Sequence, residues 1–323
     1  MMNYPHLLPI KEVGYNRMRL EFLGTGAGVP SKERNVSSLL LDLNQEKGET
    51  WLFDCGEATQ HQILKTTIKP RKVAKIFITH LHGDHIYGLP GFLSSRSFQD
   101  GTSPVMIYGP KGLESFIKTS LAISGTHLRY PFDVIEVNEG IIFEDDTMTV
   151  YAQPLEHGIP SFGYRVEEKD KQGELLPEKL RALGIPPGPI YKQIKENETT
   201  ILPDGEVVQR KDVVGDDKRG HVISILGDTR YLPNLQAFVK DSDVLIHEAT
   251  FADEDATLAY DYFHSTTTQA ATLASEANVN KLILTHISSR YTGERIEQLR
   301  LEAATIFPNV TIAHDLYQHE ITK

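Results

Sequence analysis

Four short apolar segments of this sequence each run directly into a histidine or an aspartate. The segments are rich in valine, isoleucine and leucine, and they span residues 73–79, 221–227, 243–246 and 281–285. This composition predicts buried β-strands, and the helical stretches between them predict an α/β fold with layered sheets. Because the carboxyl ends of strands in such folds form a common edge, we expect the polar residues that follow these strands to meet there.

Composition limits the classes of protein that fit. The chain has 323 residues, 40% of them hydrophobic, and its single cysteine, Cys55, excludes an internal disulfide and a cysteine cage for zinc. The apolar runs stop well short of the ~20 residues of a membrane span, and the N-terminus does not read as a secretory signal. We therefore expect a cytoplasmic protein with no membrane segment. The net charge of -11 argues against non-specific coating of nucleic acid and leaves a local, shaped site open.

The most informative motif follows the strand expected at 73–79. It reads His-Leu-His-Gly-Asp-His and supplies His80, His82, Asp84 and His85. Gly83 permits a tight bend, so that the first two histidines can point to one metal centre while Asp84 and His85 reach a second. Imidazole and carboxylate ligands without thiolate suit zinc, with manganese or iron as alternatives.

Four ligands cannot complete two centres, and the other strand ends are the expected source of the remainder. His157, Asp228 and His286 have that setting. A lone histidine or aspartate is usually structural, but the setting that these three share favours a ligand role. His247 and His264 lie beside hydroxyl and carboxyl neighbours, which suit proton transfer or phosphate contact.

One segment, residues 167–215, breaks the alternation of strands and helices and is predicted to be an insertion. Taken alone, it fits a solvated linker or an edge hairpin. Lysine and arginine balance aspartate and glutamate over residues 165–198, at seven of each. Residues 1–17 precede the first convincing strand, MRLEFLG, and are expected to form an ordinary extension.

These motifs resemble the metallo-β-lactamase superfamily and, within it, the ribonuclease Z family of short-form tRNA 3′-processing endonucleases. The superfamily signal is the motif at residues 80–85, with Asp54, His157, Asp228 and His286 in the expected order. The narrower signal is FLGTGAGVPSKERN at the start, the HEAT string at 247–250, the HST string at 264–266, and Gly188 and Pro189 in the insertion. The resemblance implies a four-layer αββα fold that forms a single domain, residues 1–323, with an inserted flexible arm at 167–215.

The resemblance also implies roles for the site residues. One zinc ion is expected on His80, His82 and His157, a second on Asp84, His85 and His286, and Asp228 is expected to bridge them. Asp54 and His247 are expected to support the ligands from outside this set. Asp84 is a candidate acceptor for the proton of the attacking water, and His264, oriented by Glu248, is the candidate donor to the leaving oxygen.

RNA contacts are implied at two places. The loop after the first strand matches the family pattern Pro-x-Lys-x-Arg-Asn and is expected to meet the RNA 3′ end through Pro30, Lys32, Arg34 and Asn35. The insertion, with Gly188 and Pro189, corresponds to the arm that grips the tRNA elbow, although here it is neutral and not basic. The family also implies a homodimer in which the arm of one subunit presents RNA to the site of the other.

The leading prediction is a zinc-dependent endoribonuclease that removes the 3′ trailer from precursor tRNA and leaves a 3′-hydroxyl on the tRNA. A second reading is a broader metal phosphodiesterase that acts on small esters and has no use for the arm. A third is an RNA-binding protein with a metal-stabilised but inactive site, which the complete ligand set and the pair of His264 and Glu248 argue against.

Overall fold

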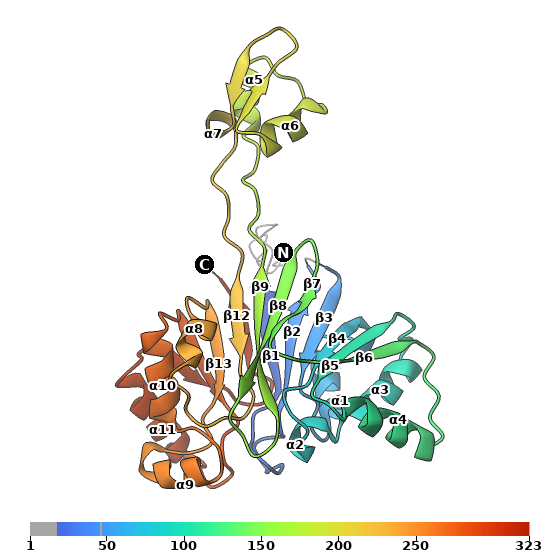
Figure 1. Cartoon of the computed structure of the whole chain (residues 1–323), viewed down its shortest axis with the longest axis vertical. Helices are drawn as coiled ribbons and strands as arrows, with labels where there is room; N and C mark the ends of the chain where they lie inside the picture. Colours follow the sequence, from blue (N-terminus) through green and yellow to red (C-terminus); the bar gives the residue numbers. More distant parts are fainter. Residues whose placement is uncertain (1–17, 46, 323) are drawn as a thin grey trace, which may run out of the picture.

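The computed structural model describes residues 18–45 and 47–322. The predicted N-terminal extension, residues 1–17, therefore lies outside the described residues. Two seven-stranded mixed sheets stack face to face in the body of the molecule (Figure 1). In spatial order, the first sheet consists of β16 (Gln318–Ile321), β1 (Met18–Gly24), β2 (Ser38–Leu43), β3 (Glu49–Phe53), β4 (Val73–Phe77), β5 (Val105–Gly109) and β6 (Phe132–Glu136). The second consists of β15 (Val310–Ile312), β14 (Lys281–Thr285), β13 (Val244–Glu248), β12 (Val222–Ile225), β9 (Ser161–Glu168), β8 (Met148–Leu155) and β7 (Gly140–Glu144).

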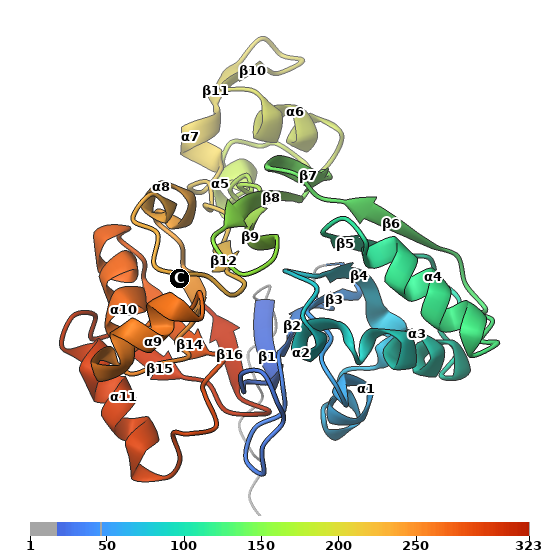
Figure 2. The same ribbon diagram turned by 60° about the horizontal axis from the view of Figure 1, so that its bottom comes forward.

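Helices cover the outer face of each sheet (Figure 2). The first sheet carries α1 (Thr59–Gln62), α2 (Gly83–Ile86), α3 (Leu89–Phe98) and α4 (Leu113–Ile123), and the second carries α8 (Leu235–Val239), α9 (Ala256–Asp261), α10 (Thr267–Glu276) and α11 (Glu294–Ala304). One apolar cluster, with Trp51, Phe77 and Tyr164 among its largest members, lies between the sheets. Each sheet also has one apolar cluster between its outer face and the helices that cover it. The predicted four-layer αββα architecture is confirmed.

The predicted strands lie where the apolar segments are. Residues 73–79 contain β4, and residues 221–227 contain β12. Residues 243–246 overlap the first part of β13, and residues 281–285 coincide with β14. Strands β12, β13 and β14 are parallel neighbours, so their carboxyl ends share one edge of the sheet. None of the helices in the described part of the chain is long and apolar enough to span a membrane.

The insertion leaves the body between β9 and β12 as a long arm (Figure 1). We define the arm as residues 169–220, slightly displaced from the predicted 167–215 because Glu167 and Glu168 still belong to β9. Its tip contains α5 (Pro177–Ala182), α6 (Ile190–Glu196), β10 (Thr199–Ile201), β11 (Val207–Gln209) and α7 (Arg210–Val213). The tip has its own small apolar cluster, which includes Leu180, Ile194 and Val213. The insertion is therefore a folded module on a narrow stalk and not a linker.

Candidate metal centre and active site

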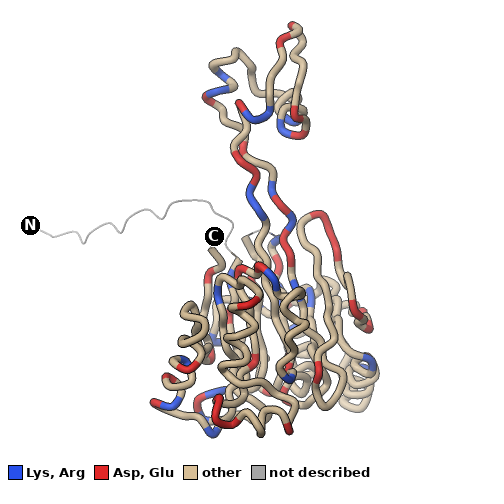
Figure 3. Tube along the Cα trace, turned by 60° about the vertical axis from the view of Figure 1, so that its left-hand side comes forward, with Lys and Arg blue, Asp and Glu red and all other residues tan. Residues whose placement is uncertain are grey.

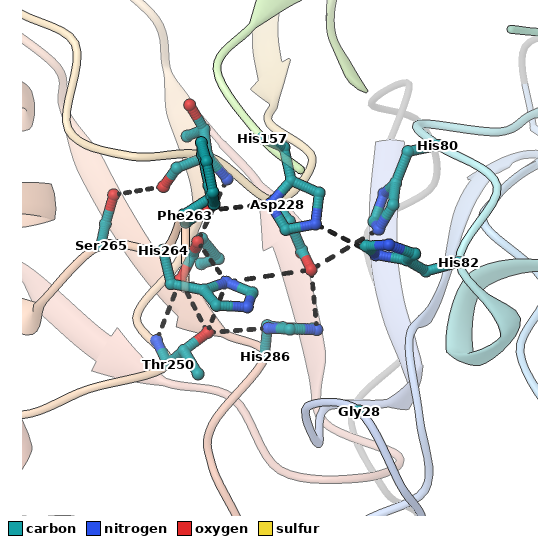
Figure 4. Close-up of polar contacts among 12 residues, drawn as sticks. Gly28, His80, His82, His157, Asp228, Thr250, Phe263, His264, Ser265 and His286 are labelled. Atoms are coloured by element: carbon teal, nitrogen blue, oxygen red, sulfur yellow. Dashed lines mark hydrogen bonds and ion pairs between the residues drawn. The ribbon is translucent and has the colours of Figure 1, made fainter. Parts of the chain in front are cut away.

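Seven side chains from distant parts of the chain meet at the common strand edge. Their ligand atoms form overlapping groups, each with all members within 4.8 Å of one another: His80 with His82 and His157, His80 with His85 and Asp228, and Asp84 with His85 and His286. Figure 4 shows His80, His82, His157, Asp228 and His286 converging from both sheets. All seven residues that the sequence predicted as metal ligands are brought together.

Asp228 lies at the centre of this cluster. Its Oδ2 is 3.6 Å from His80 Nε2, 3.6 Å from His85 Nε2 and 3.2 Å from His286 Nε2. It follows β12 in a buried loop. One carboxylate oxygen thus faces histidines from both predicted ligand groups, which is the arrangement that a bridging ligand requires.

The ring nitrogens that point away from the cluster have partners of their own. His85 Nδ1 is 2.8 Å from Asp54 Oδ2, and His157 Nδ1 is 2.9 Å from the Phe263 carbonyl. The Nδ1 atoms of His80 and His286 lie 3.0 and 2.8 Å from the hydroxyls of Thr79 and Thr250. Such partners fix the tautomer and the ring orientation of metal-binding histidines.

The two residues predicted to support the ligands behave differently. Asp54 accepts hydrogen bonds from the N–H and hydroxyl of Thr79 at 2.8 Å each, in addition to its contact with His85. His247 is buried and turns its Nδ1 to the Glu248 carbonyl, 2.6 Å away. Alternation along β13 puts His247 on the face of Leu245, toward the outer helices, whereas Glu248 shares the face of Ile246, between the sheets. The geometry gives His247 a place in the packing behind the site.

His264 and Glu248 form a hydrogen-bonded pair beside the cluster. His264 Nδ1 is 2.9 Å from Glu248 Oε1 and 3.9 Å from Asp228 Oδ2. Burial alone would lower the pKa of His264, but the carboxylates of Glu248, Asp228 and Asp84 together outweigh it and raise the pKa to about 9. Glu248 thus orients the imidazole beside the predicted metal ligands and favours its protonated form, which is the form that a general acid needs.

Ser265 and Thr266 of the HST string hold His264 in its position beside Glu248. Ser265 donates a hydrogen bond to the Thr229 carbonyl at 2.7 Å, next to Asp228. Thr266 caps α10, because its hydroxyl accepts from the Gln269 N–H while the Gln269 side chain accepts from the Thr266 N–H. His264 is thus held between a strand-end loop and the first turn of a helix.

The glycine-rich loop after β1 reaches the cluster through its backbone. The Gly28 N–H donates to Asp84 Oδ2 at 2.8 Å, and the φ of Gly28 is 72°, which favours glycine. Within the Pro-x-Lys-x-Arg-Asn pattern, Pro30 and Lys32 are exposed. Arg34 is buried, and its Nη1 donates to the Thr25 hydroxyl and the Ala313 carbonyl at 2.7 and 2.6 Å.

Asn35 is likewise engaged inside the protein. Its side-chain amide donates to the Glu57 carbonyl at 2.7 Å, and its backbone N–H donates to Asp315 Oδ2 at 2.7 Å. These contacts shape the loop from within. The other two predicted RNA-binding residues, Gly188 and Pro189, are exposed in the arm just before α6.

Several contributors were not predicted. Thr79, Thr250, Gly28 and Phe263 contact predicted ligands through a hydroxyl, an N–H or a carbonyl. A signal existed for the two threonines, since one directly precedes the ligand motif and the other ends the HEAT string. Backbone groups leave no such trace, because every residue carries them.

Comparisons with known proteins agree with this geometry. The family model described as Anti-Pycsar protein Apyc1 matches residues 18–169. Ribonuclease Z of Geobacillus kaustophilus is 56% identical over 306 residues, which cover 95% of this chain and 100% of that protein. Ribonuclease Z of Oceanobacillus iheyensis is 58% identical over 306 residues, or 94% of this chain and 100% of that protein.

Solved structures give the same result. The crystal structure of human tRNase Z, short form, superposes with a TM-score of 0.68 at 32% identity and covers 95% of this chain and 100% of that one. The metallo-β-lactamase fold protein YhfI of Bacillus subtilis superposes with a TM-score of 0.67 at 19% identity, which shows the fold alone.

The fold and the cluster of histidines and aspartates define a metal-dependent hydrolase of the metallo-β-lactamase class. The predicted class is confirmed. The chain belongs to the ribonuclease Z family, and it is an endoribonuclease.

Proposed function

We propose that the seven-ligand cluster holds two zinc ions and that this centre, with His264 and Glu248, releases the 3′ trailer from precursor tRNA. The relatives named Ribonuclease Z and the human tRNase Z make tRNA 3′ processing the activity of this enzyme. The observation that carries the residue-level proposal is the convergence of the ligand atoms beside the pair of His264 and Glu248. Since precursor tRNA is the substrate, we place the enzyme in the cytoplasm.

The donor set fits zinc. Among the described residues, His80 Nε2 and His85 Nε2 are buried and lack a hydrogen-bond partner, a state that a bound cation relieves. His82 Nδ1 and His157 Nε2 face each other at 3.1 Å. We assign one ion to His80, His82 and His157, the other to Asp84, His85 and His286, and the shared position to Asp228. Two such cations supply a more acidic water and neutralise charge on the phosphate.

The protein's own groups move the protons. Asp84 is held by Gly28 through Oδ2, and we assign its Oδ1 as the acceptor for the proton of the attacking water. His264 is held through Nδ1 by Glu248, which leaves Nε2 to donate a proton to the leaving 3′-oxygen of the tRNA. The pair of His264 and Glu248 thus acts on the leaving oxygen, and Asp84 acts on the attacking water.

We divide the Pro-x-Lys-x-Arg-Asn loop into two parts. Lys32 is exposed and is assigned to the RNA 3′ end, with Pro30 beside it. Arg34 and Asn35 act from inside the fold, where their hydrogen bonds set the path of the loop. Discrimination between a trailer and a mature CCA end would then depend on the exposed charge of Lys32 on a loop that internal hydrogen bonds hold in place.

We further propose that the enzyme works as a homodimer and that the arm binds the body of the tRNA. The arm leaves the sheet at the amino end of β12, whereas Asp228 follows its carboxyl end. In Figure 1 the arm projects away from the strand-end loops of its own subunit, a direction that favours delivery of RNA to a second subunit. Residues of both charge signs are mixed along the arm (Figure 3). We therefore assign its binding of tRNA to shape and to main-chain contacts, including those of exposed Gly188 and Pro189.

The direct test is to incubate zinc-loaded enzyme with a precursor tRNA and to map the new 3′ end. Removal of the trailer, with a 3′-hydroxyl left on the tRNA, supports the proposal. Hydrolysis of bis(p-nitrophenyl) phosphate without cleavage of precursor tRNA supports the small-ester reading instead. Sedimentation in the presence and absence of tRNA measures the proposed dimer.

A further inference from the structure

Three loops that carry site residues meet outside the sheets. Residues 156–160 follow β8 and carry His157, residues 226–234 follow β12 and carry Asp228, and residues 262–266 separate α9 from α10 and carry His264. Since no sheet ladder joins these loops to one another, some other set of contacts must keep their relative positions.

Arg230, two residues after Asp228, contacts both of the other loops. Its Nη1 donates to Glu156 Oε1 at 2.8 Å, and its backbone N–H donates to the Glu156 carbonyl at 2.9 Å. Its Nε donates to the Tyr260 carbonyl at 2.7 Å. The side chain thus ties the Asp228 loop to the residue before His157 and to the end of α9.

The guanidinium of Arg230 is also enclosed by two aromatic rings. Its Cζ lies 3.9 Å from the centroid of Tyr260 and 3.7 Å from the centroid of Phe263. A planar guanidinium stacks on aromatic faces while it donates hydrogen bonds in its own plane. Here both kinds of contact are made at once, and only 17% of the side chain is exposed.

We call the contacts of Arg230 with Glu156, Tyr260 and Phe263 the Arg230 clasp. Phe263 connects this clasp to a predicted metal ligand. Its φ is 61°, in the left-handed region that a bulky side chain rarely adopts. In that conformation its carbonyl accepts from His157 Nδ1 at 2.9 Å (Figure 4). Such backbone strain persists only where several surrounding contacts hold the residue. The stacked guanidinium is one of these contacts, together with the hydrogen bond from the Phe263 N–H to the Tyr260 carbonyl at 3.3 Å.

An arginine near a phosphodiesterase centre invites a different reading, direct contact with the substrate phosphate. The contacts of Arg230 argue against it. Both faces of the guanidinium are covered, and Nε and Nη1 already have protein acceptors. A phosphate contact would have to displace these interactions.

We propose that Arg230 is a positioning residue that holds the Phe263 carbonyl against His157 and so orients this metal ligand, while it fixes the adjacent His264. The proposal rests on the ligand role of His157 assigned above. The two can fail separately, because His157→Ala leaves zinc affinity unchanged only if the ligand assignment itself is wrong.

The test uses full-length protein with Arg230→Gln and Arg230→Lys. Lysine keeps the charge and most of the stem but cannot bridge and stack as the planar fork does. Arg129→Gln is the matched control, because Arg129 is exposed and lies 5.7 Å from the ring of Phe98, at the end of α3. Zinc affinity is measured by competition with a chromophoric chelator, and kcat and KM are measured with precursor tRNA and with bis(p-nitrophenyl) phosphate.

We expect both Arg230 variants to lower the affinity for one of the two zinc ions by about 10- to 100-fold, as is usual when a partner of a metal-binding histidine is lost. The value of kcat should fall with both substrates, and KM for precursor tRNA should stay close to that of the unmodified enzyme. In a Phe263→Gly background, Arg230→Gln should cost less zinc affinity, since glycine adopts the required φ without the stacked ring.

Two results overturn the proposal. If zinc affinity is unchanged and KM for precursor tRNA rises in a salt-dependent way, Arg230 binds the phosphate backbone. If both Arg230 variants behave like Arg129→Gln, the clasp has no influence on the site. Should Arg230→Gln fail to fold, the lysine variant decides, because its charge and volume preserve more of the packing.

Discussion

Replacing His264 by alanine tests whether this residue donates the proton to the leaving oxygen. His264 lies outside the proposed ligand set, so its loss should leave both metal sites intact. Glu248 would keep three hydrogen-bond donors, namely the Thr229 N–H at 3.1 Å and the N–H and hydroxyl of Thr250 at 3.0 and 2.7 Å. The buried carboxylate is therefore not left without partners, and we expect the variant to fold.

The size of the effect depends on the leaving group. Loss of a general acid lowers a rate by roughly 100- to 10,000-fold, which corresponds to about 2.7–5.4 kcal/mol of transition-state stabilisation. With precursor tRNA the leaving group is a ribose 3′-oxygen, which departs poorly as an anion. The p-nitrophenolate of bis(p-nitrophenyl) phosphate is a stable anion and needs no proton. We expect the full loss with tRNA and a loss within about tenfold, or 1.4 kcal/mol, with the ester.

Single-turnover rates at saturating zinc measure this difference directly, with bound zinc determined on the same samples. His61→Ala is the control, since His61 is an exposed histidine of α1. An equal loss with both substrates would mean that His264 supports the metal centre and not the leaving group. An unchanged rate with precursor tRNA would mean that another group supplies the proton.

Three further predictions concern the metal, the loop and the arm. His82→Ala should lower bound zinc from close to two ions per chain and reduce activity with both substrates, and elemental analysis that finds no transition metal in zinc-loaded wild-type protein would contradict the ligand assignment. Lys32→Ala should change discrimination between trailer-bearing and CCA-ended tRNA more than ester hydrolysis, and equal weakening of both tRNA forms in binding assays would count against its placement at the 3′ end. Residues 169–220 can be replaced with Asn-Gly, because the Glu168 N–H already donates to the His221 carbonyl at 2.8 Å and a two-residue turn can close the strands. This deletion should leave zinc content and ester hydrolysis near normal and should cut kcat/KM for precursor tRNA severely. Undiminished cleavage of precursor tRNA would exclude the arm as the tRNA-binding element.

Much of the candidate site was predictable because its histidines and aspartates directly follow predicted strands. Apolar β-branched segments predict strands by local preference, and the polar residue that follows each one must lie at a sheet edge. The motif at 80–85 adds a spacing that predicts a tight loop around a metal. His157, Asp228 and His286 followed from the same rule, although each alone is an ordinary residue.

Orientation was not predictable in the same way. Arg34 and Lys32 belong to one loop pattern, yet burial against Thr25 and Ala313 turns the first inward while the second faces solvent. His247 and Glu248 are neighbours in one string, and the pleat of β13 sends them to opposite faces. By composition alone the insertion fitted a solvated linker or an edge hairpin, but the small apolar cluster of its tip shows that the tip is folded.

The sequence by itself predicted the layered fold and the candidate ligands at the strand ends, because these predictions depend on local periodicity and on side-chain chemistry. The roles predicted for the individual ligands and for His264 depended in addition on the resemblance to a known family. Only the tertiary structure decided which ring nitrogen faces the cluster, which loop residues are free to meet RNA, and that Arg230 joins three loops through Phe263. These features arise from contacts between residues far apart in the chain. Such contacts depend on how whole elements pack, and neighbouring residues in a sequence carry no record of that packing.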